Sequence, residues 1–138
     1  MRGARMDIWV RHEGGDRYLI EVGSHGVVVD QPETGDAGPT PTDLFVGSLA
    51  ACTAHYAGRF FSRHGVDAEG FGVACTFEMA ADRPTRVGSI VLRLELPQAF
   101  PDELRGRLLA VIEHCTVHNS IVVPPEVRIE LVASERAA

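Results

Sequence analysis

"GPTPTDLFVGSLAACTAHYA" (residues 38–57) decides the fold, because it holds a helix start followed at once by an uncharged run. Thr40 fits the N-cap position, Pro41 the first helical residue and Asp43 the acidic reply of a capping box. Asp43 also complements the positive end of the helix dipole. The pattern predicts a helix from about Pro41 to His64, stopped by a left-handed glycine.

The first half of this predicted helix, residues 44–54, has no charged side chain on any face. A helix that is apolar all round has to be covered all round. One small sheet covers only one side, so in a chain this short the other side is expected to need a second subunit.

Strands are predicted before and after this helix in the sequence, and a second helix begins near Pro101. The second helix has a buried stripe at i, i+4, i+7 and i+11, which places Leu104, Leu108, Val111 and Cys115 on one face. The expected strands are 7–12, 17–22, 26–31, 71–79, 88–96 and 126–132. The order βββ-α-ββ-α-β with antiparallel hairpins predicts one α+β domain over residues 1–138.

Composition limits the possible partners of the chain. It has 138 residues, a formal net charge of −6 and a pI of about 5.4, which argues against a nucleic-acid or anionic-membrane surface. No apolar run is long enough to cross a bilayer, and no secretory signal opens the sequence. We therefore expect a cytoplasmic protein.

Three cysteines, an odd number, do not suggest a disulfide framework, so each is buried filler, a metal ligand or a reactive thiol. Cys75 shares a strand face with four apolar residues, and its position alone explains it. Cys52 and Cys115 lie on apolar helix faces, where burial is the default and suppresses reactivity. Each is followed at i+3 by a histidine, His55 or His118, so a zinc site is an alternative.

The quoted stretch, together with "HCTVHNS" (residues 114–120), resembles the OsmC/Ohr family of thiol-dependent peroxidases. The resemblance extends over nearly the whole chain. It implies an OsmC-like fold, with antiparallel sheets around two long central helices in an intertwined homodimer. It implies no metal or organic cofactor.

The resemblance also assigns roles to the two helix cysteines. Cys52 matches the peroxidatic cysteine, whose thiolate attacks an organic hydroperoxide, releases an alcohol and becomes a sulfenic acid. Cys115 matches the resolving cysteine, which captures that sulfenic acid as a disulfide. A lipoyl-type dithiol then restores the enzyme, and the activity serves oxidative-stress defence.

A buried thiol is mostly protonated at neutral pH, so Cys52 needs a nearby cation. Family members that reduce hydroperoxides use an arginine of the N-terminal hairpin, held by a glutamate in the loop before the helix. Arg17 is the first candidate here and Arg11 the second. Thr42 stands at the glutamate position, and its neighbour Asp43 is the candidate acidic replacement. A shorter side chain one position along points about 100° away around a helix, so a role as capping residue alone is the alternative.

A function from another class is also compatible with these residues. The same dimer could hold a small apolar or sulfur-containing ligand in its interface cleft, without peroxidase activity. Thiols that do not respond to peroxide would distinguish this binding module from the enzyme.

Overall fold

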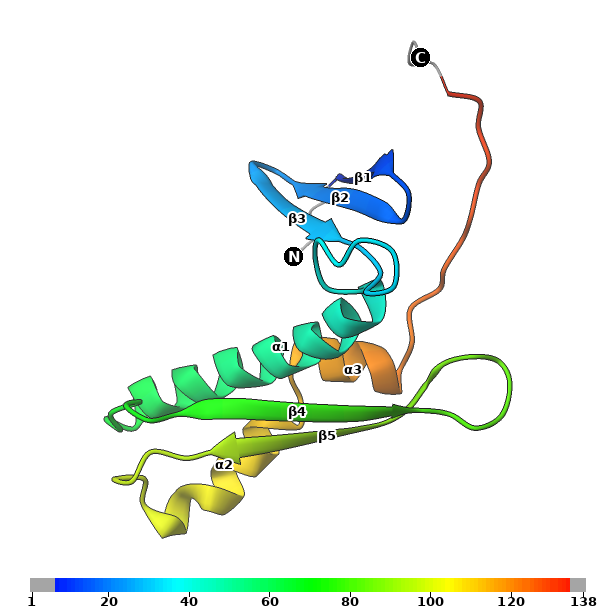
Figure 1. Ribbon diagram of the computed structural model, residues 1–138. Coiled ribbons are helices and arrows are strands. Elements are labelled where there is room, and N and C mark those ends of the chain that lie inside the picture. The colour runs from blue at the N-terminus through cyan, green and yellow to red at the C-terminus, as the bar shows by residue number, and fades with distance from the viewer. Residues whose placement is uncertain (1–6, 135–138) are drawn as a thin grey trace.

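The computed structural model describes residues 7–134. A long helix, α1 (Pro41–Arg63), runs beside a two-stranded sheet, and a three-stranded sheet lies near the beginning of that helix (Figure 1). Both sheets are antiparallel, and the mixed α+β class matches the prediction. Within residues 7–134, no helix combines the length and apolar character needed to cross a membrane.

The N-terminal sheet is a meander of β1 (Ile8–Gly14), β2 (Arg17–Val22) and β3 (His25–Val29). Its strand order is β1-β2-β3, with Val10 opposite Ile20 and Ile20 opposite Val27. All three strands lie close to their predicted positions, since β-branched and aromatic residues alternate with clear turn signals there.

The loop that leads into α1 folds around Asp30, a carboxylate that is only 4% exposed. Its oxygens accept hydrogen bonds from the backbone N–H groups of Gln31 (2.8 Å) and Ala37 (3.0 Å). The Asp30 N–H in turn donates to the Pro39 carbonyl (3.1 Å). A side chain at Gly38 would collide with the Val28 carbonyl, so only glycine permits this close return of the loop. The loop therefore has a defined path to the N-cap.

The capping of α1 is as predicted. Thr40 accepts from the Asp43 N–H and Asp43 accepts from the Thr40 N–H, each at 3.0 Å, which completes a capping box. The helix ends at Arg63, His64 is its C-cap, and Gly65 follows with a left-handed φ of 65°.

The core lies between α1, the hairpin of β4 (Gly72–Met79) and β5 (Val87–Glu95), and the helix α2 (Arg105–Ile112). On β5, alternate residues from Ile90 to Leu94 point inward and the residues between them are exposed, as the period of two predicts. The buried cluster consists of Ala57, Phe60, Phe61, Phe100, Leu108 and Ile112.

The second long helix is not continuous, which corrects the prediction. A 3-10 turn, η1 (Asp102–Leu104), precedes α2, and a separate helix, α3 (Thr116–Val122), begins directly after Cys115. Because α2 stops at Ile112, the predicted stripe breaks, and Val111 is exposed while Ile112 is buried. The helical spacing of apolar residues continued past the end of α2, so this pattern did not indicate the break between α2 and α3.

The last predicted strand, residues 126–132, is also absent from the described chain, where this segment has no strand partner. It runs extended and away from α3 (Figure 1). Val127, Ile129 and Leu131 are 77%, 84% and 95% exposed. The segment has the alternation of a strand, but within residues 7–134 it pairs with neither sheet.

Candidate active site

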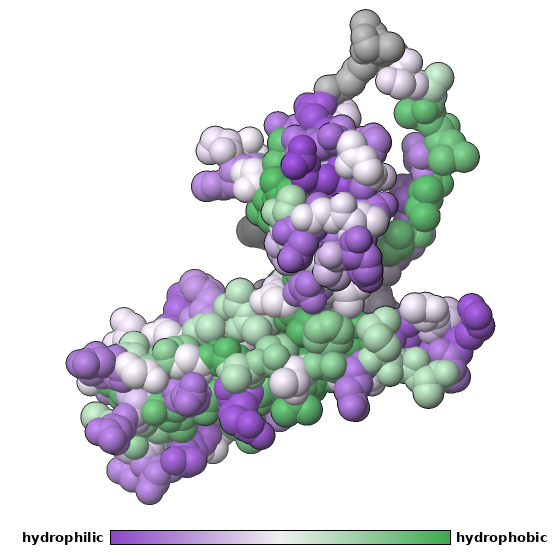
Figure 2. All heavy atoms as spheres, viewed as in Figure 1, coloured by the Kyte–Doolittle hydropathy of each residue, from purple (hydrophilic) through white to green (hydrophobic). Residues whose placement is uncertain are grey.

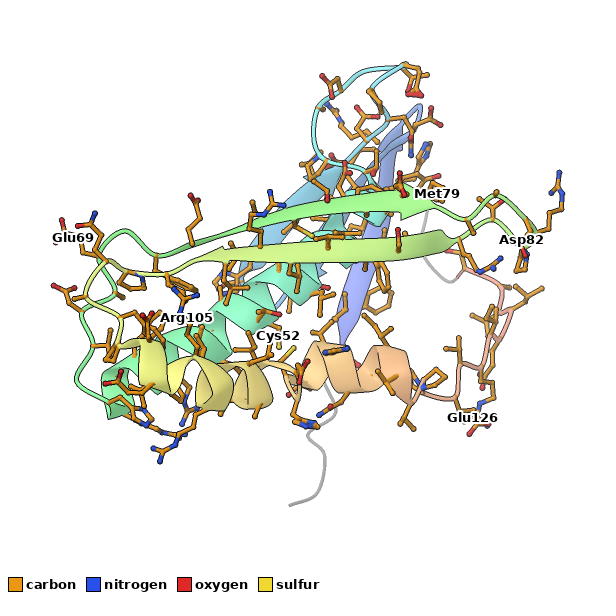
Figure 3. All side chains as sticks on the ribbon, turned by 90° about the horizontal axis from the view of Figure 1, so that it is seen from below. Cys52, Glu69, Met79, Asp82, Arg105 and Glu126 are labelled. Carbon is orange, nitrogen blue, oxygen red and sulfur yellow. The ribbon has the colours of Figure 1, made fainter. Side chains whose placement is uncertain are left out.

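Two cysteines that are far apart in the sequence meet in the structure. Cys52 is half-buried on α1, and Cys115 is completely buried at the start of α3. Cys115 is among the groups that shift the pKa of the Cys52 thiol, and α1 and α3 are in contact. In Figure 3, Cys52 lies on α1 opposite the junction between α2 and α3. The structure therefore brings together the pair that the sequence singled out.

Cys115 is the N-cap of α3, which explains why it lies where one helix ends and another begins. Its backbone is extended, and its Sγ accepts a hydrogen bond from the His118 N–H at 3.4 Å. Thr53 Oγ1, on the buried face of α1, lies 4.0 Å from the same sulfur. The thiol thus has a structural role as well as its position beside Cys52.

Burial raises the pKa of the Cys52 thiol, because desolvation disfavours the thiolate. A backbone hydrogen bond from Val117 acts in the opposite direction and lowers this pKa. The hydrogen bond and the charge of Cys115 raise it, and a backbone hydrogen bond from Thr116 lowers it, with a net upward result. Among the described residues, no arginine is one of the causes of the shift.

Cys52 opens into a cavity of about 420 Å³ on the surface between α1 and the α2–α3 junction. Its lining combines polar and apolar groups from Cys52, His55, Tyr56, Arg59, Arg63, Val111 and Thr116. The Tyr56 hydroxyl and Thr116 Oγ1 are hydrogen-bonded at 3.0 Å across this cavity wall. A molecule that enters the cavity can reach Cys52.

The predicted activating residues lie elsewhere in the subunit. Arg17 begins β2 and forms an ion pair with Glu13 at 3.5 Å, while Arg11 is paired with Glu21 across β1 and β2. Asp43 is engaged in the capping box of α1. None of these three side chains is among the groups that shift the pKa of Cys52.

The two C-x-x-H pairs do not form a metal centre in the structure. Within residues 7–134, no three His, Cys, Asp or Glu side chains are placed to hold a metal ion. His55 lines the Cys52 cavity, whereas His118 lines a separate, mainly apolar cavity with Phe45. The zinc alternative therefore finds no support in the described residues.

Cys75 lies apart from this site. It is half-buried on the inner face of β4, and burial raises the pKa of its thiol. This agrees with its interpretation as packing.

Sequence reasoning missed Tyr56, Thr116 and the two arginines of the cavity. Tyr56, Arg59 and Arg63 follow Cys52 at i+4, i+7 and i+11, which is one helical face, so this signal was present in the sequence. Thr116 had no such signal, because its position depends on where α3 begins.

A family model identifies the family of this chain. The family model described as "OsmC-like protein" matches residues 33–130. The comparison with curated proteins finds no significant match to this chain.

Solved structures show the same fold at low sequence identity. An OsmC-like protein from Mycoplasma pneumoniae has a TM-score of 0.76 at 14% identity, covering 88% of this chain and 89% of its own. An organic hydroperoxide resistance protein from Legionella pneumophila has a TM-score of 0.64 at 18% identity, with 86% and 91% covered. The organic hydroperoxide resistance protein OhrB of Bacillus subtilis has a TM-score of 0.62 at 17% identity, with 85% and 90% covered.

Proposed function

The chain belongs to the OsmC-like protein family, and from this premise we propose that it is a thiol-dependent peroxidase that reduces organic hydroperoxides. The observation that supports this most directly is the meeting of Cys52 and Cys115, two thiols from different helices. Solved structures of the same fold include proteins named for organic hydroperoxide resistance.

The exposure of the two thiols suits different steps of the proposed reaction. Cys52 lines the cavity, so its thiolate attacks the terminal oxygen of the hydroperoxide. The O–O bond breaks, the alkoxide takes a proton and leaves as an alcohol, and Cys52 becomes a sulfenic acid. Cys115 is shielded from solvent, and its thiolate then attacks the Cys52 sulfur and displaces hydroxide, which takes up the proton lost by the Cys115 thiol and leaves as water. A Cys52–Cys115 disulfide results.

Activation of Cys52 requires a positive charge that lowers its pKa. We assign this role to Arg17, with Arg11 as the second candidate and Asp43 as an acidic partner. In the single subunit each of the two arginines is held by a glutamate of the hairpin. The activating contact therefore depends on a change of partner at the hairpin.

We further propose that the protein works as a homodimer. The β1–β3 sheet stands clear of the three helices in Figure 1, and Ile8 and Val10 are exposed on it. The C-terminal segment forms an extended, mainly hydrophobic strip in Figure 2. On α1, a side chain at Gly47 or Gly58 would meet open space, so a second helix can approach closely there. A second copy would cover all three surfaces.

The reductant is proposed to be a lipoyl-type dithiol, and the compartment to be the cytoplasm. Neither a nucleic acid nor a membrane is proposed as a partner, given the net charge of −6. One OsmC-like domain over residues 1–138 is proposed.

A ligand-binding module without peroxidase activity is the second candidate. The raised pKa of Cys52 favours it, because a protonated thiol is a poor nucleophile. The same interface cleft would then hold a small apolar or sulfur-containing molecule.

Counting thiols after treatment with an organic hydroperoxide separates the two functions. A peroxidase loses two thiols per chain, and mass spectrometry of the peptides finds Cys52 joined to Cys115. Cys52→Ser abolishes both the disulfide and hydroperoxide consumption, while Cys75→Ser changes neither. Retention of all three thiols by the wild-type protein would reject the peroxidase and favour the binding module.

A further inference from the structure

We propose that Arg59 and Arg63 form a docking site for the anionic group of a small dithiol, which reduces the Cys52–Cys115 disulfide. This inference rests on the proposed function, because it concerns the step that regenerates the thiols. It assigns the charge of the reductant and the residues that recognise it.

Only one sulfur of the disulfide faces the cavity. Cys115 is 0% exposed and does not line the cavity, whereas Cys52 is half-buried and does. The attack of a thiolate on a disulfide needs access to the sulfur that is attacked. The reductant therefore has to reach Cys52 through this cavity, with Cys115 as the leaving group.

The leaving group, the Cys115 sulfur, lies beside groups that stabilise a thiolate. The Cys115 sulfur already accepts a hydrogen bond from the His118 N–H, and Thr53 Oγ1 lies 4.0 Å away. A thiolate that is better stabilised leaves a disulfide faster. The sulfur that must leave when Cys52 is attacked, Cys115, is therefore also the sulfur that is stabilised as a thiolate.

The cavity has the charge that suits an anion. Arg59 and Arg63 line it, and none of the described residues that line it is a carboxylate. Neither arginine forms an ion pair within residues 7–134. On a chain of net charge −6, this is a local site of opposite sign. An alkyl hydroperoxide is neutral, whereas a reducing thiol reacts as a thiolate, so the arginines favour the reductant over the oxidant.

The spacing along α1 between Cys52 and the two arginines fits a small molecule that contacts both. Arg59 and Arg63 lie seven and eleven residues after Cys52, which is about 10 Å and about 16 Å along the helix axis. Arg59 and Arg63 line the same cavity as Cys52, so the interval to be spanned lies within that cavity. A dithiol with a carboxylate on a short alkyl chain spans this interval.

The proposed reduction is balanced. A thiolate of the dithiol attacks the Cys52 sulfur, the Cys52–Cys115 bond breaks, and Cys115 leaves as a thiolate that takes a proton. The second thiol of the reductant, once deprotonated, attacks its own sulfur in the mixed disulfide and releases the Cys52 thiolate. Two electrons pass from the dithiol, which becomes a cyclic disulfide, to the protein.

Dihydrolipoate and dihydrolipoamide test the inference, because they share the same dithiol and differ in one carboxylate. The Cys52–Cys115 disulfide is first formed with diamide, which needs no peroxidase activity. The return of protein thiols is then timed with each reductant. We expect dihydrolipoate to be about five-fold faster at low salt, and this ratio to approach one in about 0.5 M NaCl.

The variant Arg59→Gln/Arg63→Gln should lose the preference for dihydrolipoate while its rate with dihydrolipoamide stays within about two-fold, since only the ion pairing is removed. Arg93→Gln is the matched control, because Arg93 is an exposed arginine of β5 outside the cavity. An equal preference in the double variant and in the control would overturn the inference.

The two proposals fail in different ways. If the disulfide forms and both reductants act equally fast on the wild-type protein, the docking site is wrong and the peroxidase proposal stands. If diamide forms no Cys52–Cys115 disulfide, both proposals are wrong. If reduction is charge-dependent but hydroperoxide leaves the thiols intact, only the peroxidase proposal is wrong.

Discussion

Replacing Cys115 with alanine or with serine separates its role as a helix cap from its role in redox chemistry. Both substitutions remove the second sulfur, so neither variant can form the Cys52–Cys115 disulfide. Only serine keeps an acceptor for the His118 N–H, which Cys115 Sγ accepts at 3.4 Å in the structure. Serine is also a preferred N-cap residue.

The expected loss of stability follows from two contributions. Loss of the N-cap acceptor in Cys115→Ala costs about 1 kcal/mol. Removal of one heavy atom from a site that is 0% exposed costs about another 1 kcal/mol, by analogy with removal of a buried methyl group. Cys115→Ala should therefore be about 2 kcal/mol less stable than the wild-type protein, and Cys115→Ser about 1 kcal/mol more stable than the alanine variant.

Urea unfolding of the reduced proteins at one fixed protein concentration measures these differences, because association makes the apparent stability depend on concentration. Thermal unfolding should show the serine variant melting about 4 °C above the alanine variant. Equal midpoints for the two variants would refute the assignment of Cys115 as the cap of α3. Both variants should also retain one-thiol oxidation at Cys52 without disulfide formation.

Two further predictions concern the thiol and the assembly. Cys115→Ala should lower the pKa of Cys52, because it removes a thiol whose hydrogen bond and charge both raise that pKa. The pH midpoint of Cys52 alkylation by iodoacetamide then falls, and an unchanged or higher midpoint would contradict the coupling. Ile129→Glu/Leu131→Glu should shift the protein from dimer to monomer in sedimentation equilibrium, because both residues lie on the apolar face of the C-terminal segment, whereas Glu130→Gln on the other face should not; a dimer that survives the double substitution would show that this segment is not part of the interface.

The local elements were predictable because their signals are short-range. Thr40, Pro41 and Asp43 lie within one helical turn, so the start of α1 could be located from the sequence. The five strands described in the structure follow from alternation and turn residues in the same way. The two errors arose where the outcome depends on distant parts of the chain. The periodic stripe continued across the break before Cys115, and residues 126–132 pair with neither sheet of the described subunit.

The candidate site likewise has features that local sequence patterns predicted and features that depend on tertiary packing. Sequence alone determined that Cys52 lies within an apolar helix and that Cys75 shares a strand with packing residues, whereas it placed Cys115 on the face of a second helix that ends before this residue. Only the tertiary structure decided that the Cys52 and Cys115 thiols interact, because their contact joins residues 63 positions apart, and no local propensity acts over that separation. It likewise decided that Cys115 is the buried sulfur and Cys52 the accessible one, since burial depends on how α1, α2 and α3 pack together.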